Sequence, residues 1–287
     1  MDPAPRDDYG AAMADAPDWL HRLLGWKAST ETSRPACERL FGEAIAPNLA
    51  DVGSAASMQL AGYAYETMGI SRGQLRSSRL ESDSSGAASS GAALEKAIED
   101  DLRATLPVRD SRRSWLVSRG GDVSTFAQFT HLNDLQRLLL ENPTLRATFA
   151  GDYQVQTDVY VGVENSADAH EPPFLHAAIS SKWTIRSDRV QNVRHEFATL
   201  VRNRRGRAPH LVLVTAEPLP SRLLSIARGT GEVDAVYHLL YDELDVAVET
   251  LCGSGGRYPE QRVAWSEMIE QRRLRPYSAL VDDLTLS

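Results

Sequence analysis

Three residues in the middle of the chain have the types and spacing needed to hydrolyse a phosphodiester. Lys182 ends an apolar run, Glu196 follows it by fourteen positions, and Asp158 lies in the apolar stretch before it. Phosphodiester hydrolysis at neutral pH needs a nucleophilic hydroxide, relief of negative charge and help for the leaving oxygen, and carboxylate-held Mg²⁺ can supply these. Because Mg²⁺ takes oxygen ligands and keeps several waters, two or three carboxylates suffice. A lysine beside the phosphate would orient or deprotonate the water, or stabilise negative charge.

These residues fit the usual nuclease motif only in part. The motif is Pro-Asp, a gap, then Asp or Glu, any residue and Lys, but here Thr157 precedes Asp158 and Ser180 stands where the second acid would be. Glu196 can fill the same space if it lies on the helix that follows the strand. The alternative is a solvated strand end with one lysine and two surface acids. On the residues alone, both interpretations stay open.

Hydrophobic periodicity predicts the elements that would position these side chains. Alternation over residues 153–161 predicts a half-buried strand with Asp158 on its less apolar side. The apolar run 174–179 predicts a neighbouring strand that ends at Lys182. Ser187 can cap a following helix, in which Glu196 adjoins the apolar stripe. A further helix over 93–106 carries Glu95 beside its apolar face.

The remaining pattern predicts an α/β fold with a central mixed sheet flanked by helices, because strands and helices alternate through the C-terminal half. We expect strands over 111–117, 210–215 and 233–237, and helices over 124–141, 220–227, 242–251 and 259–274. The helix over 124–141 would bury Phe126, Phe129, Leu132, Leu135 and Leu139, and the last helix would carry Val263, Trp265 and Ile269. Residues 1–80 are expected to form an N-terminal helical region with a disordered start over 1–15 and short helices near 19–24, 35–46 and 58–68. This region is expected to be integrated with a nuclease core over 81–287, which begins with a mobile loop over 81–93.

The charge is unevenly distributed along the chain. The 287 residues carry a formal charge of −8, which at first argues against a nucleic-acid partner. Residues 182–228, however, contain ten basic and three acidic residues, so this window carries +7 and the rest −15. A local basic face on an acidic body fits a phosphate-binding cleft.

Composition also bounds the compartment. With 42% hydrophobic residues the chain can form a real core, and its two cysteines, Cys37 and Cys252, favour neither a disulfide framework nor a cysteine zinc site. No run approaches the roughly 18 apolar residues of a membrane span, and the N-terminus lacks a secretion signal. We therefore expect a cytoplasmic protein without a membrane partner.

A long run joins the lysine to an arginine-rich turn and resembles a known family. The run is Ser180-Ser181-Lys182-Trp183-Thr184-Ile185-Arg186-Ser187-Asp188-Arg189. Within 175–192, and together with 200–210, 215–218, 220–222 and 229–232, it resembles the NgoMIV-type Type II restriction endonucleases, a CCGG-core group of the PD-(D/E)XK nuclease superfamily. The resemblance is dense over 151–244, weaker over 91–150 and slight elsewhere. It implies a restriction-endonuclease-like fold.

The resemblance assigns catalytic roles residue by residue. It places the metal-binding aspartate at Asp158, the catalytic lysine at Lys182, the displaced acidic residue at Glu196 and an additional upstream glutamate at Glu95. Asp158, Glu196 and Glu95 would hold Mg²⁺, with two ions per active site. Ser181 replaces a cysteine that contributes only its backbone to the metal site.

The resemblance also assigns base reading to the arginine-rich turn. Arg186, Asp188 and Arg189 would read the central base pairs, because an arginine fork matches guanine O6 and N7 and a carboxylate accepts from cytosine N4. The alternative is that Ser187 and Asp188 only cap a helix while the two arginines bind phosphate. Arg222 matches the residue that reads the outer G·C pair, and its partner is sought near residues 29–31. The run Arg202, Arg204, Arg205 and Arg207 would contact phosphate or another subunit, or be solvated.

Together these assignments predict a Mg²⁺-dependent enzyme that cuts double-stranded DNA at a CCGG-containing palindrome, GCCGGC, after the first G with 5′ overhangs. A palindrome implies a twofold dimer. The resemblance further implies a tetramer of two dimers, and a cognate DNA methyltransferase as the system partner without contact. The rival interpretations are another metal-dependent nuclease, such as a repair enzyme, and a non-catalytic sequence-specific DNA-binding protein.

Overall fold

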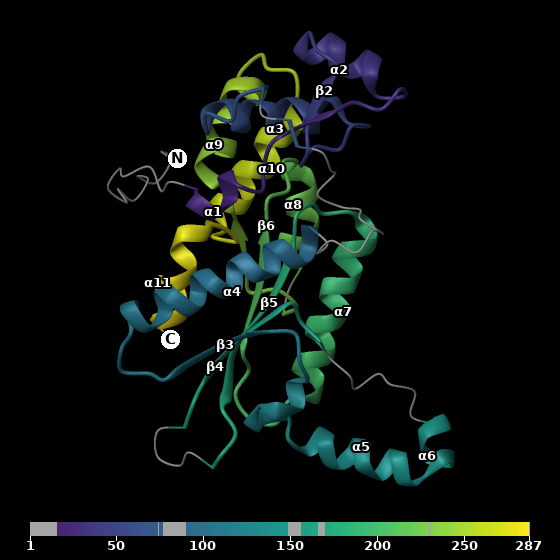
Figure 1. Ribbon diagram of the computed structural model, residues 1–287, viewed down its shortest axis with the longest axis vertical. Helices are drawn as coiled ribbons and strands as arrows, with labels where there is room; N and C mark the ends of the chain where they lie inside the picture. Colours follow the sequence, from purple (N-terminus) through teal and green to yellow (C-terminus); the bar gives the residue numbers. More distant parts are fainter. Residues whose placement is uncertain are drawn as a thin grey trace, which may run out of the picture.

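The computed structural model describes residues 16–73, 75–76, 90–148, 156–165, 170–229 and 231–286 (Figure 1). The predicted disorder over 1–15 and most of the predicted loop over 81–93 lie outside these residues. Residues 90–93 belong to a helix and not to a loop, because α4 (Ser90–Arg109) begins three residues earlier than its apolar stripe suggests.

The centre of the fold is a six-stranded mixed sheet in the order β3-β4-β5-β6-β7-β8. The first three strands are antiparallel neighbours, and each pair from β5 to β8 is parallel. The predicted α/β fold with a mixed sheet flanked by helices is therefore confirmed. The strands are β3 (Trp115–Arg119), β4 (Val159–Val163), β5 (Phe174–Lys182), β6 (His210–Thr215), β7 (Ala235–His238) and β8 (Leu274–Pro276).

Apolar side chains on both faces of the sheet explain why helices cover each face. In β6, Leu211 and Leu213 pack in the cluster formed with α7, α8 and α10, whereas Val212 and Val214 pack in the cluster formed with α4 and α11. This alternation follows from the period of two along a strand. The covering helices are α7 (Ser187–Asn203), α8 (Pro220–Ala227), α9 (Tyr241–Cys252), α10 (Pro259–Glu270) and α11 (Leu280–Thr285), with the short 3₁₀ helix η3 (Tyr277–Ala279) before the last.

Helix α4 lies across one face of the sheet in Figure 1 and carries the predicted stripe. Leu94, Ile98, Leu102 and Leu106 are each 0% exposed, at the spacing expected for one helical face. The helix prediction is confirmed, and Glu95 lies beside the buried stripe and is itself half-buried.

The N-terminal part contains two short strands that periodicity does not reveal. β1 (Trp26–Ala28) pairs antiparallel with β2 (Ile45–Pro47), so the second half of the helix predicted near 35–46 is wrong. Trp26 joins the core cluster on the α4 face, and Leu60 joins the cluster on the α7 face. The helices here are α1 (Asp18–His21), α2 (Arg34–Phe41) and α3 (Ala55–Thr67).

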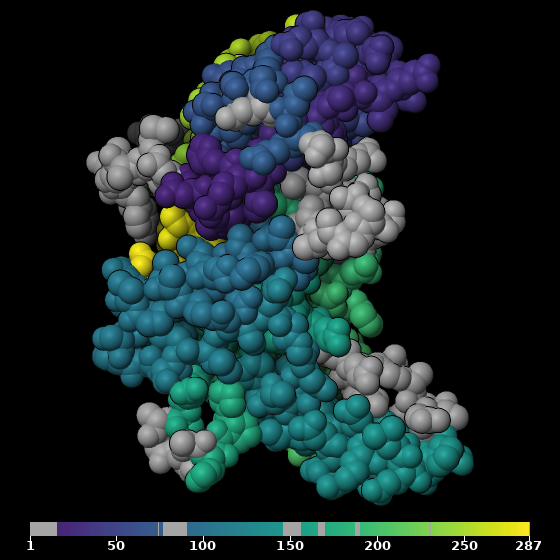
Figure 2. All heavy atoms as spheres, in the orientation of Figure 1, coloured from purple at the N-terminus to yellow at the C-terminus, as the bar shows by residue number. Residues whose placement is uncertain are grey.

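The single helix predicted over 124–141 is wrong at its start. The segment forms η1 (Val123–Thr125), η2 (Ala127–Phe129) and then α5 (His131–Glu141), followed by α6 (Pro143–Thr148). The cause is tertiary: Gln128 exchanges two hydrogen bonds of 2.8 Å with the backbone of Leu175 in β5, and Ala127 N–H donates to Pro173. Helices α5 and α6 project from the body as an arm (Figures 1 and 2).

The last predicted helix is also shorter than expected. Helix α10 ends at Glu270, and β8 and α11 follow it, which the pattern did not reveal. Val263 is 67% exposed, because the buried face of α10 consists of Gln261, Ala264, Trp265 and Met268. Gln261 takes a core position by accepting a hydrogen bond from the Ser221 N–H. None of the helices in the described parts of the chain is long and apolar enough to cross a membrane.

Candidate active site

Asp158 and Lys182 meet where two antiparallel strands end. β4 begins immediately after Asp158 and β5 ends at Lys182, and the register pairs Val159 with Ile179. Asp158 therefore lies beside the last residues of β5. Its Oδ2 accepts from Lys182 Nζ at 2.6 Å, from the Ser181 N–H at 2.6 Å and from Ser180 Oγ at 3.2 Å.

The residue before Asp158 is held by hydrogen bonds and not by strand pairing. The predicted strand over 153–161 begins only at Val159 in the described residues, and residues 153–155 lie outside them. Thr157 Oγ1 donates to the Ile179 carbonyl at 3.0 Å, and its N–H donates to the Tyr160 hydroxyl at 3.1 Å. A proline at this position could make neither bond, since it lacks both the N–H and the hydroxyl.

Glu196 and Glu95 approach the pair from opposite faces of the sheet, on α7 and α4. Burial raises the pKa of Glu196, with Asp158 adding to the rise and Lys182 opposing it. Burial likewise raises the pKa of Glu95, again with Asp158 adding and Lys182 opposing. Lys182 thus bonds to one carboxylate, that of Asp158, and its charge acts on two others, those of Glu196 and Glu95.

This donor set fits a hard divalent cation by its chemistry. Carboxylate oxygens are the ligands Mg²⁺ prefers, and the mutual repulsion of the three acids would be relieved by a cation between them. Within the described residues, however, no three acidic, histidine or cysteine side chains converge closely enough to hold a metal ion as they stand. Lys182 Nζ instead lies against Asp158 Oδ2, on the carboxylate a cation would share.

The arginine-rich turn follows Lys182 directly. Arg186 is exposed and is the N-cap residue of α7, so the predicted cap at Ser187 is wrong: Ser187 is the first helical residue. Asp188 and Arg189 follow it in the first turn of α7, and their side chains lie outside the described parts. The turn therefore lies at the end of the sheet where Lys182 is found.

Arg222 is paired with a carboxylate that the sequence did not point to. Its guanidinium donates to Asp51, which lies 171 positions earlier, after β2. Burial raises the pKa of Asp51, but the Arg222 bond, the Gly53 N–H and the charges of Arg222 and Arg186 outweigh it and lower the pKa overall. A small open pocket here is lined by residues 48–51, Lys27, Thr184, Arg186 and Arg222. The partner sought near 29–31 is thus not the residue beside Arg222.

Glu217 is a second carboxylate that sequence reasoning left without a role. It is 0% exposed, and its side chain accepts from the N–H groups of Ile185 at 2.7 Å and Leu219 at 2.9 Å. Burial raises its pKa to about 7, although both N–H groups and Arg222 lower it. The available signal was an acid two residues after the end of the buried strand β6. Asp51 offered only a turn-forming Asp-Val-Gly.

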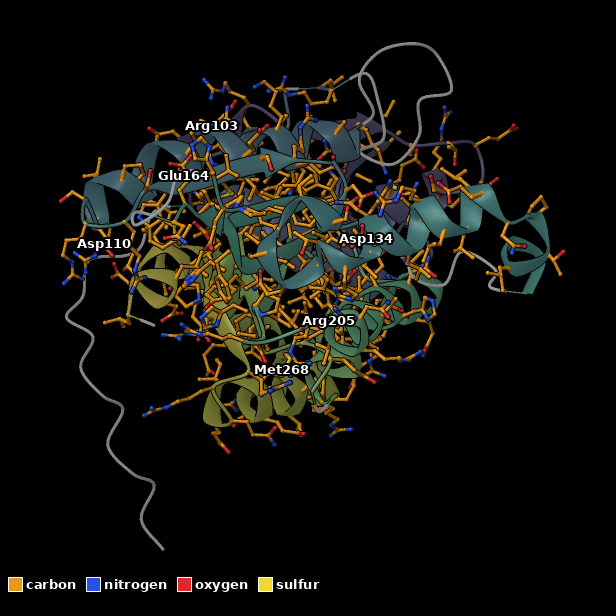
Figure 3. The ribbon with its side chains drawn as sticks, turned by 90° about the horizontal axis from the view of Figure 1, so that it is seen from below. Arg103, Asp110, Asp134, Glu164, Arg205 and Met268 are labelled. Carbon is orange, nitrogen blue, oxygen red and sulfur yellow. The ribbon has the colours of Figure 1, made fainter. Side chains whose placement is uncertain are left out.

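The basic run of the sequence lies away from these residues. Arg202 is in the last turn of α7, and a helix of 17 residues is roughly 25 Å long. Arg204 donates to the Val201 carbonyl, and the Arg205 N–H donates to Gln128. Figure 3, seen from below, labels Arg205, which follows α7 in the chain, and Asp134, which lies on the projecting helix α5. The run is therefore at the opposite end of α7 from Arg186.

A mixed sheet with an aspartate and a lysine at adjacent strand ends, and a glutamate on the next helix, defines a restriction-endonuclease-like core. The family model described as NgoMIV restriction enzyme matches residues 36–171 and 166–286. The chain therefore belongs to the NgoMIV restriction enzyme family.

Individual relatives agree with this assignment to different degrees. The Type II restriction enzyme NgoMIV of Neisseria gonorrhoeae is 39% identical over an alignment of 188 positions. The match covers 58% of this chain and 64% of that relative, less than two thirds of its length. A crystal structure of the pre-specific restriction endonuclease BsaWI with DNA covers 85% of each chain at 14% identity, with a TM-score of 0.31. That likeness is too low to support a conclusion about function.

Proposed function

We propose that this protein is a Type II site-specific deoxyribonuclease that hydrolyses both strands of a CCGG-containing palindrome, GCCGGC, after the first G. The observation that carries the proposal is the hydrogen bond between Lys182 and Asp158. Lys182 is only four residues before Arg186, and Arg186 lines a pocket together with Arg222. Cutting groups and groups suited to reading guanine thus share one end of the sheet. Membership of the NgoMIV restriction enzyme family supports the same activity.

The contacts of Lys182 and Asp158 support a proposal for the catalytic roles. Lys182 donates a hydrogen bond to the scissile phosphate and stabilises its negative charge. Asp158, itself held by the Ser181 N–H, accepts a hydrogen bond from the Lys182 ammonium group and so positions it. Glu196, on the helix that follows Lys182, is the proposed acidic partner of Asp158 in metal binding. Asp158, Glu196 and Glu95 would hold up to two Mg²⁺ ions, which supply charge relief at the transition state.

The specificity roles rest on donor and acceptor chemistry. Arg186, Asp188 and Arg189 read the inner pairs as guanine and cytosine partners. Arg222 and Asp51 form an arginine–carboxylate pair, which is the combination that a G·C pair matches in the major groove. In free protein these two side chains satisfy each other, and on DNA they would exchange that bond for guanine and cytosine edges.

Cleavage of matched plasmids tests the proposal. Plasmids that differ only in carrying GCCGGC, ACCGGT or GCTAGC are incubated with the protein and Mg²⁺, and the ends are sequenced. We expect discrete fragments from GCCGGC alone, with staggered 5′ ends after the first G, and none when EDTA replaces Mg²⁺. Fragments from ACCGGT as well would remove the roles of Arg222 and Asp51. Degradation without discrete fragments would favour a nuclease of another kind, and binding without cutting a DNA-binding protein.

The proposed assembly follows from the symmetry of the site. A palindrome is read by two copies related by a twofold axis, so we propose a homodimer. That two such dimers pair into a homotetramer is proposed from the resemblance to the NgoMIV-type enzymes alone. Sedimentation of the protein with one GCCGGC duplex separates two chains from four. The cognate DNA methyltransferase is proposed as the protective partner of the same system, and methylated GCCGGC is expected to resist cleavage.

A further inference from the structure

Glu217 lies beneath two elements that the proposed function assigns to different base pairs. One carboxylate oxygen, Oε2, accepts from the N–H of Ile185, the residue before Arg186 at the N-cap of α7. The other oxygen, Oε1, accepts from the N–H of Leu219, the N-cap residue of α8, which carries Arg222. One side chain therefore binds the entry points of both helices.

The backbone of Glu217 is itself fixed to the sheet. Its N–H donates to Thr215 Oγ1 at 3.2 Å, at the end of β6. Its carbonyl accepts from His238 Nε2 at 3.0 Å, and burial lowers the pKa of that histidine to about 4, so the ring is neutral and Nδ1 is free to accept from Leu240. A carboxylate anchored on two neighbouring strands makes a rigid base for the residues it holds.

Glu217 also interacts electrostatically with Arg222, which lines the small pocket described above. Its Oε2 lies 3.9 Å from a guanidinium nitrogen of Arg222, and the same arginine bonds Asp51. Asp51 in turn feels the charge of Arg186. Arg186, Arg222, Asp51 and Glu217 thus form one charge network, of which only Glu217 is fully buried.

We propose that Glu217 is a positioning residue that holds Arg186, which reads an inner base pair, and Arg222, which reads the outer base pair, in one fixed arrangement. The inner and outer base pairs are then read together. This inference rests on the proposed function. Loss of the Glu217 hydrogen bonds to the Ile185 and Leu219 N–H groups would let each arginine bind independently. Discrimination against DNA sites with a wrong inner or outer base pair would then fall. Glu217 touches no base in this proposal and acts only through the two backbone N–H groups and Arg222.

A double-mutant cycle on DNA binding tests the coupling. Arg186→Ala, Arg222→Ala and the double variant are measured for binding to a GCCGGC duplex without divalent cation. We expect the double variant to lose less affinity than the product of the two single losses, by about threefold or more, because losing one arginine already disturbs the other. In the Glu217→Gln background the losses should multiply independently. The Asp234→Asn background is the control, since Asp234 accepts the Leu211 N–H at the other end of β6.

The ratio of cleavage of GCCGGC to ACCGGT separates positioning from loss of folding. Partial unfolding lowers both cleavage rates equally. Loss of the Glu217 hydrogen bonds should instead lower the ratio of GCCGGC to ACCGGT cleavage by about tenfold in Glu217→Gln. An unchanged ratio in folded Glu217→Gln, or independent losses in the wild-type background, would overturn the inference. If Glu217→Gln does not fold, Glu217→Asp, whose shorter side chain cannot reach both N–H groups, takes its place in the cycle and in the ratio. Wild-type protein that neither binds nor cuts GCCGGC would instead remove the proposed function, and this inference with it.

Discussion

At the scale of single residues, Asp158 is the meeting point of the candidate site. Three hydrogen bonds from consecutive residues of β5 converge on its Oδ2. The side chains of Lys182 and Asp158 are 24% and 20% exposed, so the pair is reachable from solvent but partly shielded from it. Such a pair keeps a lysine in place without burying it, and this suits a group that must reach a phosphate.

Replacing Lys182 tests this placement directly. We expect Lys182→Ala to lower the rate of GCCGGC cleavage by about 100-fold or more, because a positioned charge or proton carrier is lost, while DNA binding is retained. Single-turnover cleavage and a binding assay measure the two effects. Lys96→Ala, which removes an exposed lysine paired with Asp100, is the control. Cleavage by Lys182→Ala at the control's rate would take the lysine out of the mechanism.

The raised pKa of Glu217 makes a prediction about stability. Its folded-state pKa of about 7 lies above its ordinary value of 4.5, so between these values the folded protein keeps a proton that the unfolded chain releases. Stability from this group therefore falls as the pH rises through this window. Relative to Glu217→Gln, the wild type should lose about 3 kcal/mol of unfolding free energy between pH 4.5 and pH 7.5. Denaturant unfolding of both proteins across this range measures it, and parallel curves would contradict it.

At the scale of elements, β5, the arginine turn and α7 form one continuous unit. The strand ends in Lys182, the turn holds Arg186, and the helix carries Glu196. A shift of the turn on a wrong sequence would also displace the lysine and the glutamate. Recognition and cutting are coupled by covalent continuity in this hypothesis.

Arg186→Ala tests the coupling between recognition and cutting. We expect the cleavage rate on GCCGGC to fall by about tenfold more than the affinity, since the variant loses both a base contact and the position of Lys182. Arg262→Ala is a suitable control, because this exposed residue pairs with Glu249 on neighbouring helices. Equal losses of rate and affinity would leave Arg186 as a binding residue alone.

The reassigned face of α10 gives a packing prediction. Leu102 on α4 is 0% exposed and Val263 on α10 is 67% exposed. Leu102→Ala should cost about 2–5 kcal/mol of unfolding free energy through the cavity it leaves, whereas Val263→Ala should change it by less than about 0.5 kcal/mol. Chemical denaturation measures both values. A large loss at Val263 would mean that this face is covered in solution.

Periodicity predicted best those elements whose apolar pattern is unbroken. The strand over 210–215 and the helix over 220–227 agree with β6 and α8 to the residue. Strands of three residues, such as β1, β2 and β8, are too short to show a period. The break before α5 depends on Gln128, whose amide bonds β5 47 positions away, and no local pattern reveals such a partner.

The candidate site was predictable where a motif or a resemblance named its residues. Asp158, Lys182, Glu196 and Glu95 were chosen in this way, and the structure brings their charges within mutual influence. Asp51 and Glu217 could not be chosen, because their meaning depends on Arg222 and on two backbone N–H groups. Whether the named residues act as assigned stays a prediction for the experiments above.

At the scale of the whole molecule, the basic window of the sequence divides between two places. Arg186 and Arg222 line the pocket, while residues 202–207 comprise the last residues of α7 and those that follow its far end. Others in the window are paired internally, with Arg194 bonded to Glu232 and Arg228 to Glu267. The net positive charge of residues 182–228 therefore does not mark one DNA-binding surface.

Salt dependence distinguishes the two groups of arginines. We expect the logarithm of the affinity for GCCGGC to fall linearly with the logarithm of the salt concentration, and Arg205→Ala to keep the wild-type slope, because Arg205 is remote from the pocket. Fluorescence titrations at several salt concentrations give the slope. A slope shallower by about 0.9 in Arg205→Ala would place a phosphate at that end of α7.

The antiparallel pairing of β4 with β5 has a consequence for how such sites are found and altered. Asp158 and Lys182 lie at one end of the paired strands, whereas Val163, where β4 ends, and Phe174, where β5 begins, lie at the other. The number of residues between them is therefore set by the hairpin and is not fixed by the reaction. A search that demands a fixed interval between the acid and the lysine will miss relatives with longer hairpins. A tag or a small domain inserted between Val163 and Phe174 would enter the chain between the two proposed catalytic residues, at the opposite end of the paired strands.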